Sequence, residues 1–263
     1  MKSSKSLVRR LSNKAKVILY SFFLVSFCLA GCANPADIRE PDAMTALALY
    51  LDGFDKNDKE NPVSLPPVML KSIDEWEDML GVIALKGKYV HVDISGSTGF
   101  ELFAPEAMQT GGNLIVSLIL PNTMTGIGNN AFTHFVHLTS VTIPNSVTSI
   151  GSFVFNNCSG LTSVTIPDSV NSIRYNAFSG CTGLTSVTIP NNVTLIDSSA
   201  FSGCTGLTRV FYGGINSTAW NRITISSENS SLTSATRYYF SATKPDTTGT
   251  HWRWVEENPT VWE

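Results

Sequence analysis

Charged side chains are scarce in this sequence, above all in its middle. They make up 15% of the 263 residues, and residues 113–208 contain only three, Asp168, Arg174 and Asp197. General acid–base catalysis requires titratable groups with tuned pKa values, and this stretch has almost none to offer. Nucleic-acid binding requires clustered positive charge, and no such cluster follows residue 31. The composition therefore argues against an enzyme and against a nucleic-acid partner.

Catalytic and metal-binding motifs are missing as well. The sequence has no G-x-S-x-G, no H-E-x-x-H, no P-loop and no paired-carboxylate motif. His134 and His137 form an H-x-x-H pair that could hold a metal, but no cysteine or acidic residue lies near them in the sequence. Structural zinc sites combine four ligands, so we favour an exposed turn for these histidines. We expect no catalytic residue, no metal and no cofactor.

The sequence lacks a hydrophobic run long enough for an ordinary transmembrane helix. The N-terminal run, Val17–Ala30, has 14 residues, whereas a membrane span needs about 20. It follows a basic segment that ends at Lys16, and this order is typical of an export signal. A marginal membrane anchor or a buried helix is the alternative. We predict that residues 1–31 are a signal peptide.

The predicted signal ends in Leu29-Ala30-Gly31-Cys32, which resembles the lipobox of bacterial lipoproteins. The resemblance implies cleavage before Cys32 and a diacylglycerol on its sulfur. Such a residue anchors a protein to a membrane, since each buried CH₂ contributes about 0.8 kcal/mol. Ala33 follows instead of an acidic residue, which favours the outer membrane or cell surface within the envelope. Without residues 1–31, which hold six of the 18 basic residues and no acid, 12 basic residues face 21 acidic ones.

A 23-residue repeat dominates the rest of the sequence. The phrase LTSVTIP occurs at Leu138–Pro144, Leu161–Pro167 and Leu184–Pro190, and a weaker copy is visible at Tyr89–Ser95. Self-similarity at such a period is typical of solenoids. Four sets of residues keep the interval over four copies: Pro121, Pro144, Pro167 and Pro190; Ile127, Ile150, Ile173 and Ile196; Phe132, Phe155, Phe178 and Phe201; Leu138, Leu161, Leu184 and Leu207.

Each copy has an apolar side that it cannot bury alone. In Leu161–Gly183, Val164 and Ile166 alternate with polar residues as in a strand, and Pro167 ends that strand. Stacking buries the apolar side, because each strand pairs with the strand of the next copy about 4.8 Å away. The sequence therefore predicts a solenoid built around a parallel β-sheet.

The repeat L-T-S-V-T-I-P-x-S-V-x-S-I-x-x-x-A-F-x-x-C-x-G resembles the BspA-like leucine-rich repeats of bacterial surface proteins. The match is tight over Leu114–Thr208 and loose over Tyr89–Asn113. Asn61–Ser95 and Tyr238–Trp262 resemble the cap and tail beside such repeats. The resemblance implies a β-rich leucine-rich-repeat solenoid and a role in surface adhesion. The asparagine of ordinary leucine-rich repeats is mostly absent, so their curvature is not expected.

The ends of the solenoid need covers, because terminal coils expose apolar atoms and strand edges. We predict a cap helix at Asp74–Leu85 with Asp74 as its N-cap residue, and a short helix at Met44–Leu51. Towards the C-terminus we predict one strand and a hairpin of two more: Ile223–Ile225, then Tyr238–Phe240 with Trp252–Val255. The expected domains are a signal peptide (1–31), a lipidated N-terminus and tether (32–60), an N-terminal cap (61–88), the solenoid (89–212) and a C-terminal cap or tail (213–263).

Three cysteines share one position of the repeat, Cys158, Cys181 and Cys204. The first complete copy has Phe135 there, so we predict an apolar position and a buried row of thiols. A disulfide between neighbouring coils is the alternative, although parallel side chains rarely adopt its dihedral angle of about 90°.

Three of the five tryptophans crowd the tail: Trp252, Trp254 and Trp262. We interpret them as packing of the cap, with a platform for stacking sugars as the alternative.

The polar residues of the predicted strands form the candidate binding surface. Ser and Thr alternate with buried residues in three copies, and the fourth copy has Arg209 and Phe211 in their place. Arg and large aromatic residues often dominate interface energy. The simpler interpretation is that Ser and Thr only solubilise a β-face, with Phe211 covered by the tail. The predicted partner-binding residues are Ser140, Thr142, Ser163, Thr165, Ser186, Thr188, Arg209 and Phe211.

We therefore expect an exported, lipid-anchored binding protein without catalytic activity. The implied partner is a protein of the host matrix or of other bacteria, and the lipid on Cys32 is the contact with the membrane. A structural lipoprotein of the cell envelope without an external ligand is the alternative.

Overall fold

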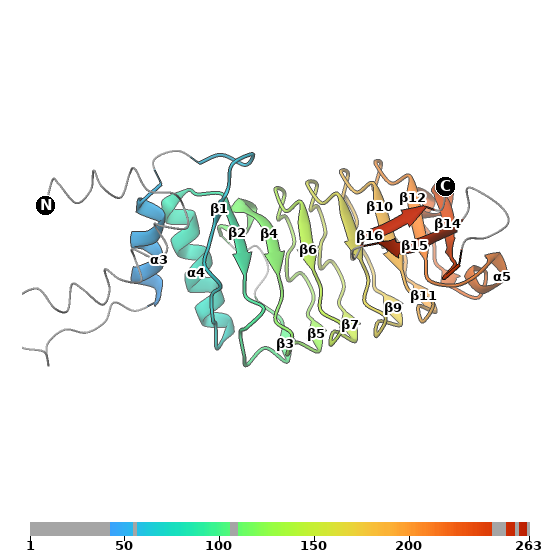
Figure 1. Cartoon of the computed structure of the whole chain (residues 1–263), viewed down its shortest axis with the longest axis horizontal. Coiled ribbons are helices and arrows are strands. Elements are labelled where there is room, and N and C mark those ends of the chain that lie inside the picture. Colours follow the sequence, from blue (N-terminus) through green and yellow to red (C-terminus); the bar gives the residue numbers. More distant parts are fainter. Residues whose placement is uncertain (1–42, 55–56, 106–109, 244–250, 256–257, 262–263) are drawn as a thin grey trace, which may run out of the picture.

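The computed structural model describes residues 43–54, 57–105, 110–243, 251–255 and 258–261. Within these ranges the chain winds into an elongated solenoid whose coils lie side by side, from two N-terminal helices to a group of C-terminal strands (Figure 1). The predicted β-rich leucine-rich-repeat solenoid is confirmed. The predicted signal peptide and Cys32 lie outside the described residues.

The coils contribute strands to two sheets that follow one another along one face, and we call the two together the front sheet. Its N-terminal part contains β1 (Val63–Ser64), β2 (Val90–Asp93), β4 (Ile115–Ile119) and β6 (Ser140–Thr142). It continues with β8 (Ser163–Thr165), β10 (Ser186–Ile189), β12 (Arg209–Tyr212), β14 (Thr236–Phe240), β15 (His251–Val255) and β16 (Asn258–Val261). The register equals one repeat: Ser186 lies between Ser163 and Arg209. Equivalent residues therefore form straight rows across the strands.

A second parallel sheet runs along the other side of the coils. Its strands have two residues each: β3 (Leu102–Phe103), β5 (Gly126–Ile127), β7 (Ser149–Ile150), β9 (Ser172–Ile173), β11 (Leu195–Ile196) and β13 (Thr224–Ile225). Ile150 pairs with Ile173, and both are buried. The predicted strand at Ile223–Ile225 is confirmed as β13. The core lies between the two sheets.

A row of stacked phenylalanines runs through the core, at the position of phenylalanine in the 23-residue repeat. Neighbouring rings have centroids 5.2–5.4 Å apart and lie within 20° of parallel: Phe103, Phe132, Phe155, Phe178 and Phe201. Phe103 extends the row by one coil beyond the four copies identified from the sequence. Trp76 of the cap packs edge-on against Phe103 at 5.2 Å and closes the row.

The N-terminal cap consists of α3 (Ala43–Asp52) and α4 (Ile73–Lys86), so both predicted helices are confirmed. The prediction of Asp74 as the N-cap residue of α4 is wrong, because Ser72 has that role. The Ser72 hydroxyl accepts the backbone N–H of Glu75 at 3.2 Å, and the Glu75 carboxylate accepts that of Lys71 at 2.7 Å. This reciprocal arrangement resembles a capping box. Asp74 lies in the first turn, where its negative charge interacts favourably with the positive end of the helix dipole.

The C-terminal strands differ from the predicted hairpin. The segments Tyr238–Phe240 and Trp252–Val255 do pair, within β14 and β15, but in parallel. The reason is that β14 follows β12 in parallel and β15 extends the same sheet. The strand that turns back is β16, antiparallel to β15, with Trp252 opposite Val261. Parallel stacking thus continues beyond residue 212, the predicted end of the solenoid.

Three short helical segments complete the described fold: η1 (Gly112–Leu114), α5 (Ser217–Trp220) and α6 (Ser230–Ser234).

Candidate functional site

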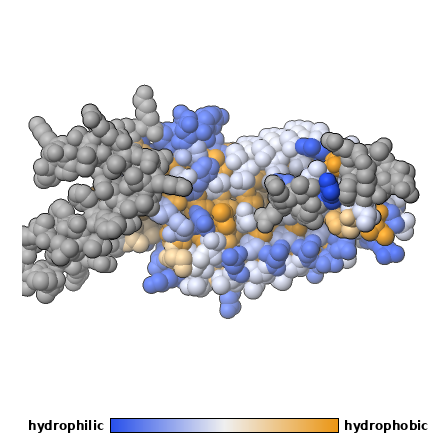
Figure 2. Space-filling model, in the orientation of Figure 1, coloured by the Kyte–Doolittle hydropathy of each residue, from blue (hydrophilic) through white to orange (hydrophobic). Residues whose placement is uncertain are grey.

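Over one half of the front sheet, the side chains of the predicted Ser and Thr rows are exposed to solvent. Ser140 and Thr142 on β6 and Ser163 and Thr165 on β8 are all exposed. Figure 2 shows few strongly hydrophilic side chains over the middle coils of this face, whereas blue ones gather over the N-terminal cap and along the edges. The accessible surface is therefore neutral and rich in hydroxyls.

Towards the C-terminus the same rows are covered. Ser186 is 9% exposed, Thr188 5% and Phe211 3%. Phe211 stacks on Tyr238 with centroids 5.5 Å apart and lies 5.7 Å from the ring of Trp252. The expected exposed pair of Arg209 and Phe211 is therefore not formed: Phe211 packs beneath the strands that follow β12, while Arg209 stays exposed.

The hydroxyls of the repeat fall into two groups that the sequence does not distinguish. Threonines just before the strands donate to the backbone carbonyl 23 residues earlier at 2.9–3.3 Å: Thr139, Thr162, Thr185 and Thr208. Among the described residues, the hydroxyls of Thr142 and Thr165 have no protein partner. The first group of hydroxyls links neighbouring coils, and the second group is available to solvent or to a ligand.

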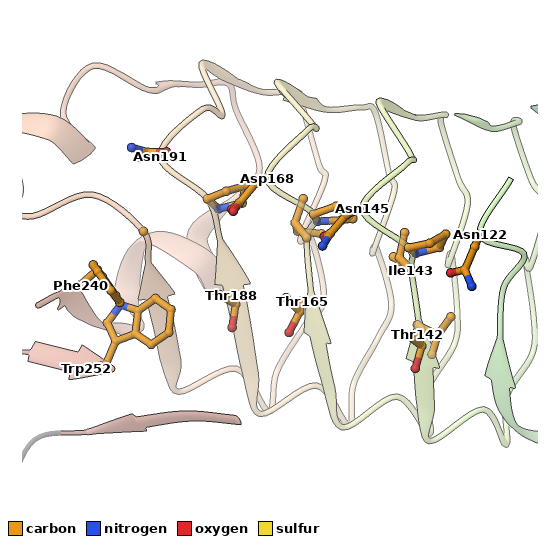
Figure 3. A pocket seen from close by; sticks show the side chains of 16 residues that line it. Asn122, Thr142, Ile143, Asn145, Thr165, Asp168, Thr188, Asn191, Phe240 and Trp252 are labelled. Carbon is orange, nitrogen blue, oxygen red and sulfur yellow. The ribbon is translucent and has the colours of Figure 1, made fainter. Parts of the chain in front are cut away.

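A groove of about 820 Å³ runs across the front sheet where the strands end. Thr142, Thr165 and Thr188 lie along one side of it (Figure 3). Its floor is apolar and includes Val141, Ile143 and the repeat prolines. Figure 3 places the other rim above these threonines, formed by side chains that each follow a repeat proline: Asn122, Asn145, Asp168 and Asn191.

The rim residues were not among the predicted site residues. Their signal in the sequence is a polar residue directly after each proline of the 23-residue repeat. All four are exposed, and within the described chain their side chains have no hydrogen-bond partner. Asparagines elsewhere are used by the fold: Asn156 Nδ2 donates to Ser179 O at 3.2 Å and Asn192 Nδ2 to Asp168 O at 2.7 Å. The rim thus presents unused hydrogen-bonding groups.

Two aromatic side chains close the C-terminal end of the groove. Phe240 and Trp252 pack edge-to-face with centroids 5.4 Å apart. The indole N–H of Trp252 donates to the carbonyl of Tyr212 at 2.8 Å, which fixes the ring. Trp252 is 1% exposed, so the interpretation as cap packing is confirmed for this residue. The side chains of Trp254 and Trp262 lie outside the described residues.

The predicted row of buried thiols is confirmed, and all three cysteines are free. Each Sγ donates to a backbone carbonyl at 3.1 Å: Cys158 to Phe132, Cys181 to Phe155 and Cys204 to Phe178. Burial raises the pKa of Cys158 and Cys204 to about 12 and raises that of Cys181 further. Because the thiolate is the reactive form, these cysteines are unsuited to nucleophilic or redox chemistry.

Two of the histidines take part in hydrogen bonds between neighbouring coils. His137 Nδ1 lies 2.7 Å from the carbonyl of Asn113, and His91 Nδ1 lies 2.6 Å from the hydroxyl of Ser117. Burial lowers the pKa of His91 below its usual range. Among the described residues, no three His, Cys, Asp or Glu side chains gather as a metal site would require. Nor does any helix in that part of the chain have the length and apolarity to cross a membrane.

The sequence of the repeats matches the family described as BspA type Leucine rich repeat region, in six copies over residues 111–223. No curated protein is similar enough in sequence to count as a relative.

Several solved structures are similar to parts of the chain. A leucine rich cell surface protein from Faecalibacterium prausnitzii A2-165 is 29% identical, over 45% of this chain and 34% of that one, with a TM-score of 0.36. The Leucine Rich Repeat protein of T. pallidum is 23% identical, over 48% and 58%, with a TM-score of 0.40. A leucine-rich repeat protein from Bacteroides ovatus ATCC 8483 is 22% identical, over 57% and 44%, with a TM-score of 0.41. The chain thus spans between 34% and 58% of the length of these proteins.

The family match covers the coils in which the strands, the phenylalanines and the thiols repeat at one interval. Residues 111–223 of this chain therefore belong to the BspA-type leucine-rich repeats.

Proposed function

We propose that the chain is a non-catalytic protein of the cell surface, held by a lipid on Cys32, that binds a protein of the host matrix or of other bacteria with its front sheet. The observation that carries this proposal is the open half of the sheet, where exposed hydroxyls are not used by the fold. A stacked core keeps these side chains in fixed positions, so that little order has to be created on binding.

The proposed contact surface consists of the exposed residues of the front sheet: Ser140, Thr142, Ser163, Thr165 and Arg209. Ser163 and Arg209 lie in the same row, with the covered Ser186 between them. Arginine, the residue type at position 209, is among those that most often contribute a large share of the binding energy of an interface. The hydroxyls add neutral hydrogen bonds, so salt should weaken binding only mildly.

The location rests on the sequence before residue 33. A basic segment, an apolar run and Leu29-Ala30-Gly31-Cys32 follow one another in the order of a lipoprotein signal. Brief protease treatment of intact cells tests exposure, because only a surface protein is degraded. Survival of the chain on intact cells, with loss after lysis, would instead indicate an envelope component without an external ligand.

Binding is tested by pull-down of host-matrix and bacterial surface proteins with the chain and two variants. Ser163→Arg places a bulky charge in the open sheet and should abolish capture of the partner. Asn171→Arg places the same charge at an exposed position beside β9 in the second sheet and should leave capture unchanged. Equal capture by both variants would remove the front sheet as the binding surface.

A further inference from the structure

The groove at the strand ends is a second candidate site, with chemistry of its own. We infer that it binds a linear, neutral oligosaccharide, with about one sugar ring over each coil. This inference goes beyond the proposed protein partner and does not depend on it. The groove shares Thr142 and Thr165 with the proposed contact surface, but its other lining residues, such as Asn145 and Asp168, lie outside that surface.

Both rims of the groove offer hydrogen bonds at the spacing of the coils. Thr142 and Thr165 lie along one side of the groove, and Asn145 and Asp168 lie along the other (Figure 3). Hydroxyls and amides donate as well as accept, which matches the mixed character of sugar hydroxyls. Among the described residues none of these side chains has a protein partner, so a ligand would not have to displace one.

The row of threonines continues to the closed end of the groove. Thr188 is 5% exposed and lines the groove, and its hydroxyl has no protein partner within the described chain. A ligand hydroxyl at this end of the groove could therefore bond to Thr188 without displacing a protein group.

The floor and the end wall suit the other face of a sugar. Pyranose rings combine polar edges with faces made of C–H groups. The floor presents Val141, Ile143 and Pro144, and Phe240 stands at the closed end. Apolar contact below and hydrogen bonds at both sides are what such a ring requires.

Charge and spacing decide between ligand classes. Among the described residues that line the groove, Asp168 alone is charged, so none of them is a cation that would attract an anionic chain. An extended peptide places side chains on one face about 6.6 Å apart, whereas neighbouring coils lie about 4.8 Å apart. A pyranose linked through opposite ring positions has nearly the length of one coil spacing. The groove therefore matches a neutral β-1,4-linked chain better than a peptide.

The test titrates the full chain with cellohexaose, mannohexaose and chitohexaose by isothermal titration calorimetry. At least one of them should bind, and Asn145→Ala with Thr165→Val should weaken that binding about tenfold, through two lost hydrogen bonds. Ser163→Ala, on the same strand and face but outside the groove lining, should bind as the unmodified chain does. Thr188→Val should weaken binding while the ligand-free melting temperature stays equal or rises.

Three results would overturn the inference. One is that none of the three saccharides binds, and another is that the double variant binds a saccharide with the same affinity as the unmodified chain. The third is preferential binding, lost in the same double variant, of a galacturonic acid hexamer or of an extended peptide. Capture of a protein partner is a separate readout: it should persist in Asn145→Ala alone, which lies outside the proposed contact surface, and disappear in Ser163→Arg, so the failure of one proposal leaves the other testable.

Discussion

Single residues in the core contact two coils at once. Phe155 stacks on Phe132 and on Phe178 with centroids 5.4 Å away in both directions, and it is fully buried. Loss of this ring would leave a cavity between neighbouring coils. The exposed Thr165, ten residues away, has no such role.

The first prediction compares these two positions. Phe155→Ala should lower the free energy of unfolding by about 3–5 kcal/mol, the usual range for a buried phenylalanine. Thr165→Ala should change it by less than about 0.5 kcal/mol. Chemical denaturation measures both, and effects of equal size would contradict the assignment of inside and outside.

The second prediction concerns the thiols. The folded protein holds the protons of Cys158 and Cys204 up to about pH 12, whereas an ordinary thiol loses its proton near 9.0. Above the ordinary value the unfolded state binds fewer protons, so the free energy of unfolding should fall as the pH rises towards 12 and be unaffected by these thiols below 9. Other groups also titrate there, so the control is the variant with alanine at both positions, which should show a shallower fall.

At the scale of elements, the two ends of the solenoid are closed by different devices. At the N-terminus, α4 covers the first coils, and Ser72 is its N-cap residue. The third prediction is that Ser72→Ala lowers the free energy of unfolding by about 1 kcal/mol, since the N–H of Glu75 loses its acceptor. Asp74→Asn should lower the free energy of unfolding by less, because it removes only a negative charge near the positive end of the helix dipole. The reverse order in thermal unfolding would restore Asp74 as the N-cap residue.

At the other end, one side chain replaces the backbone of a missing coil. In the inner coils a phenylalanine N–H donates to the next coil, as from Phe178 to the carbonyl of Ala200 at 2.8 Å. The N–H of Phe201 donates instead to Asn229 Oδ1 at 2.9 Å, and Asn229 Nδ2 donates to the carbonyl of Asp197 at 2.9 Å. Asn229 is 3% exposed. Its amide thus pairs backbone groups that the end of the row would leave buried and unpaired.

The fourth prediction follows from this role. Asn229→Leu should lower the free energy of unfolding by about 1–3 kcal/mol, because a buried N–H loses its partner. Asn191→Ala, at the groove rim and without a protein partner among the described residues, should have almost no effect. Similar losses in both variants would show that the amide of Asn229 is not what closes this end.

At the scale of the whole molecule, the proposed lipid anchor decides where the front sheet of the solenoid is presented. The fifth prediction is that Cys32→Ala abolishes lipidation, so that the chain leaves the membrane fraction or keeps residues 1–31. Intact-mass analysis of the protein from cells measures both features. A native protein that carries no lipid on Cys32 would contradict the anchor.

The sequence by itself determined the stacking. A strict interval of 23 residues means that each coil meets a copy of itself, so a side chain that is apolar in one copy is packed against its own equivalent in the next. For this reason Phe155, Phe178, Cys181 and the strand at Ser163–Thr165 could all be predicted from their positions. The short cap helices were also predictable, because their apolar spacing is local.

Only the tertiary structure decided which parts of the repeated surface are usable. Thr162 and Thr165 are the same residue type in one copy, yet one hydroxyl is bonded to the preceding coil and the other is unpaired within the described chain. Phe211 is covered because β14 and β15 extend the sheet beside β12, a contact between segments remote in sequence. The groove rim arises in the same way, from the alignment of four separate turns. A periodic sequence determines which side chains recur in every coil. Contacts between coils, and contacts at the two ends of the solenoid, determine which of these side chains stay accessible to a ligand.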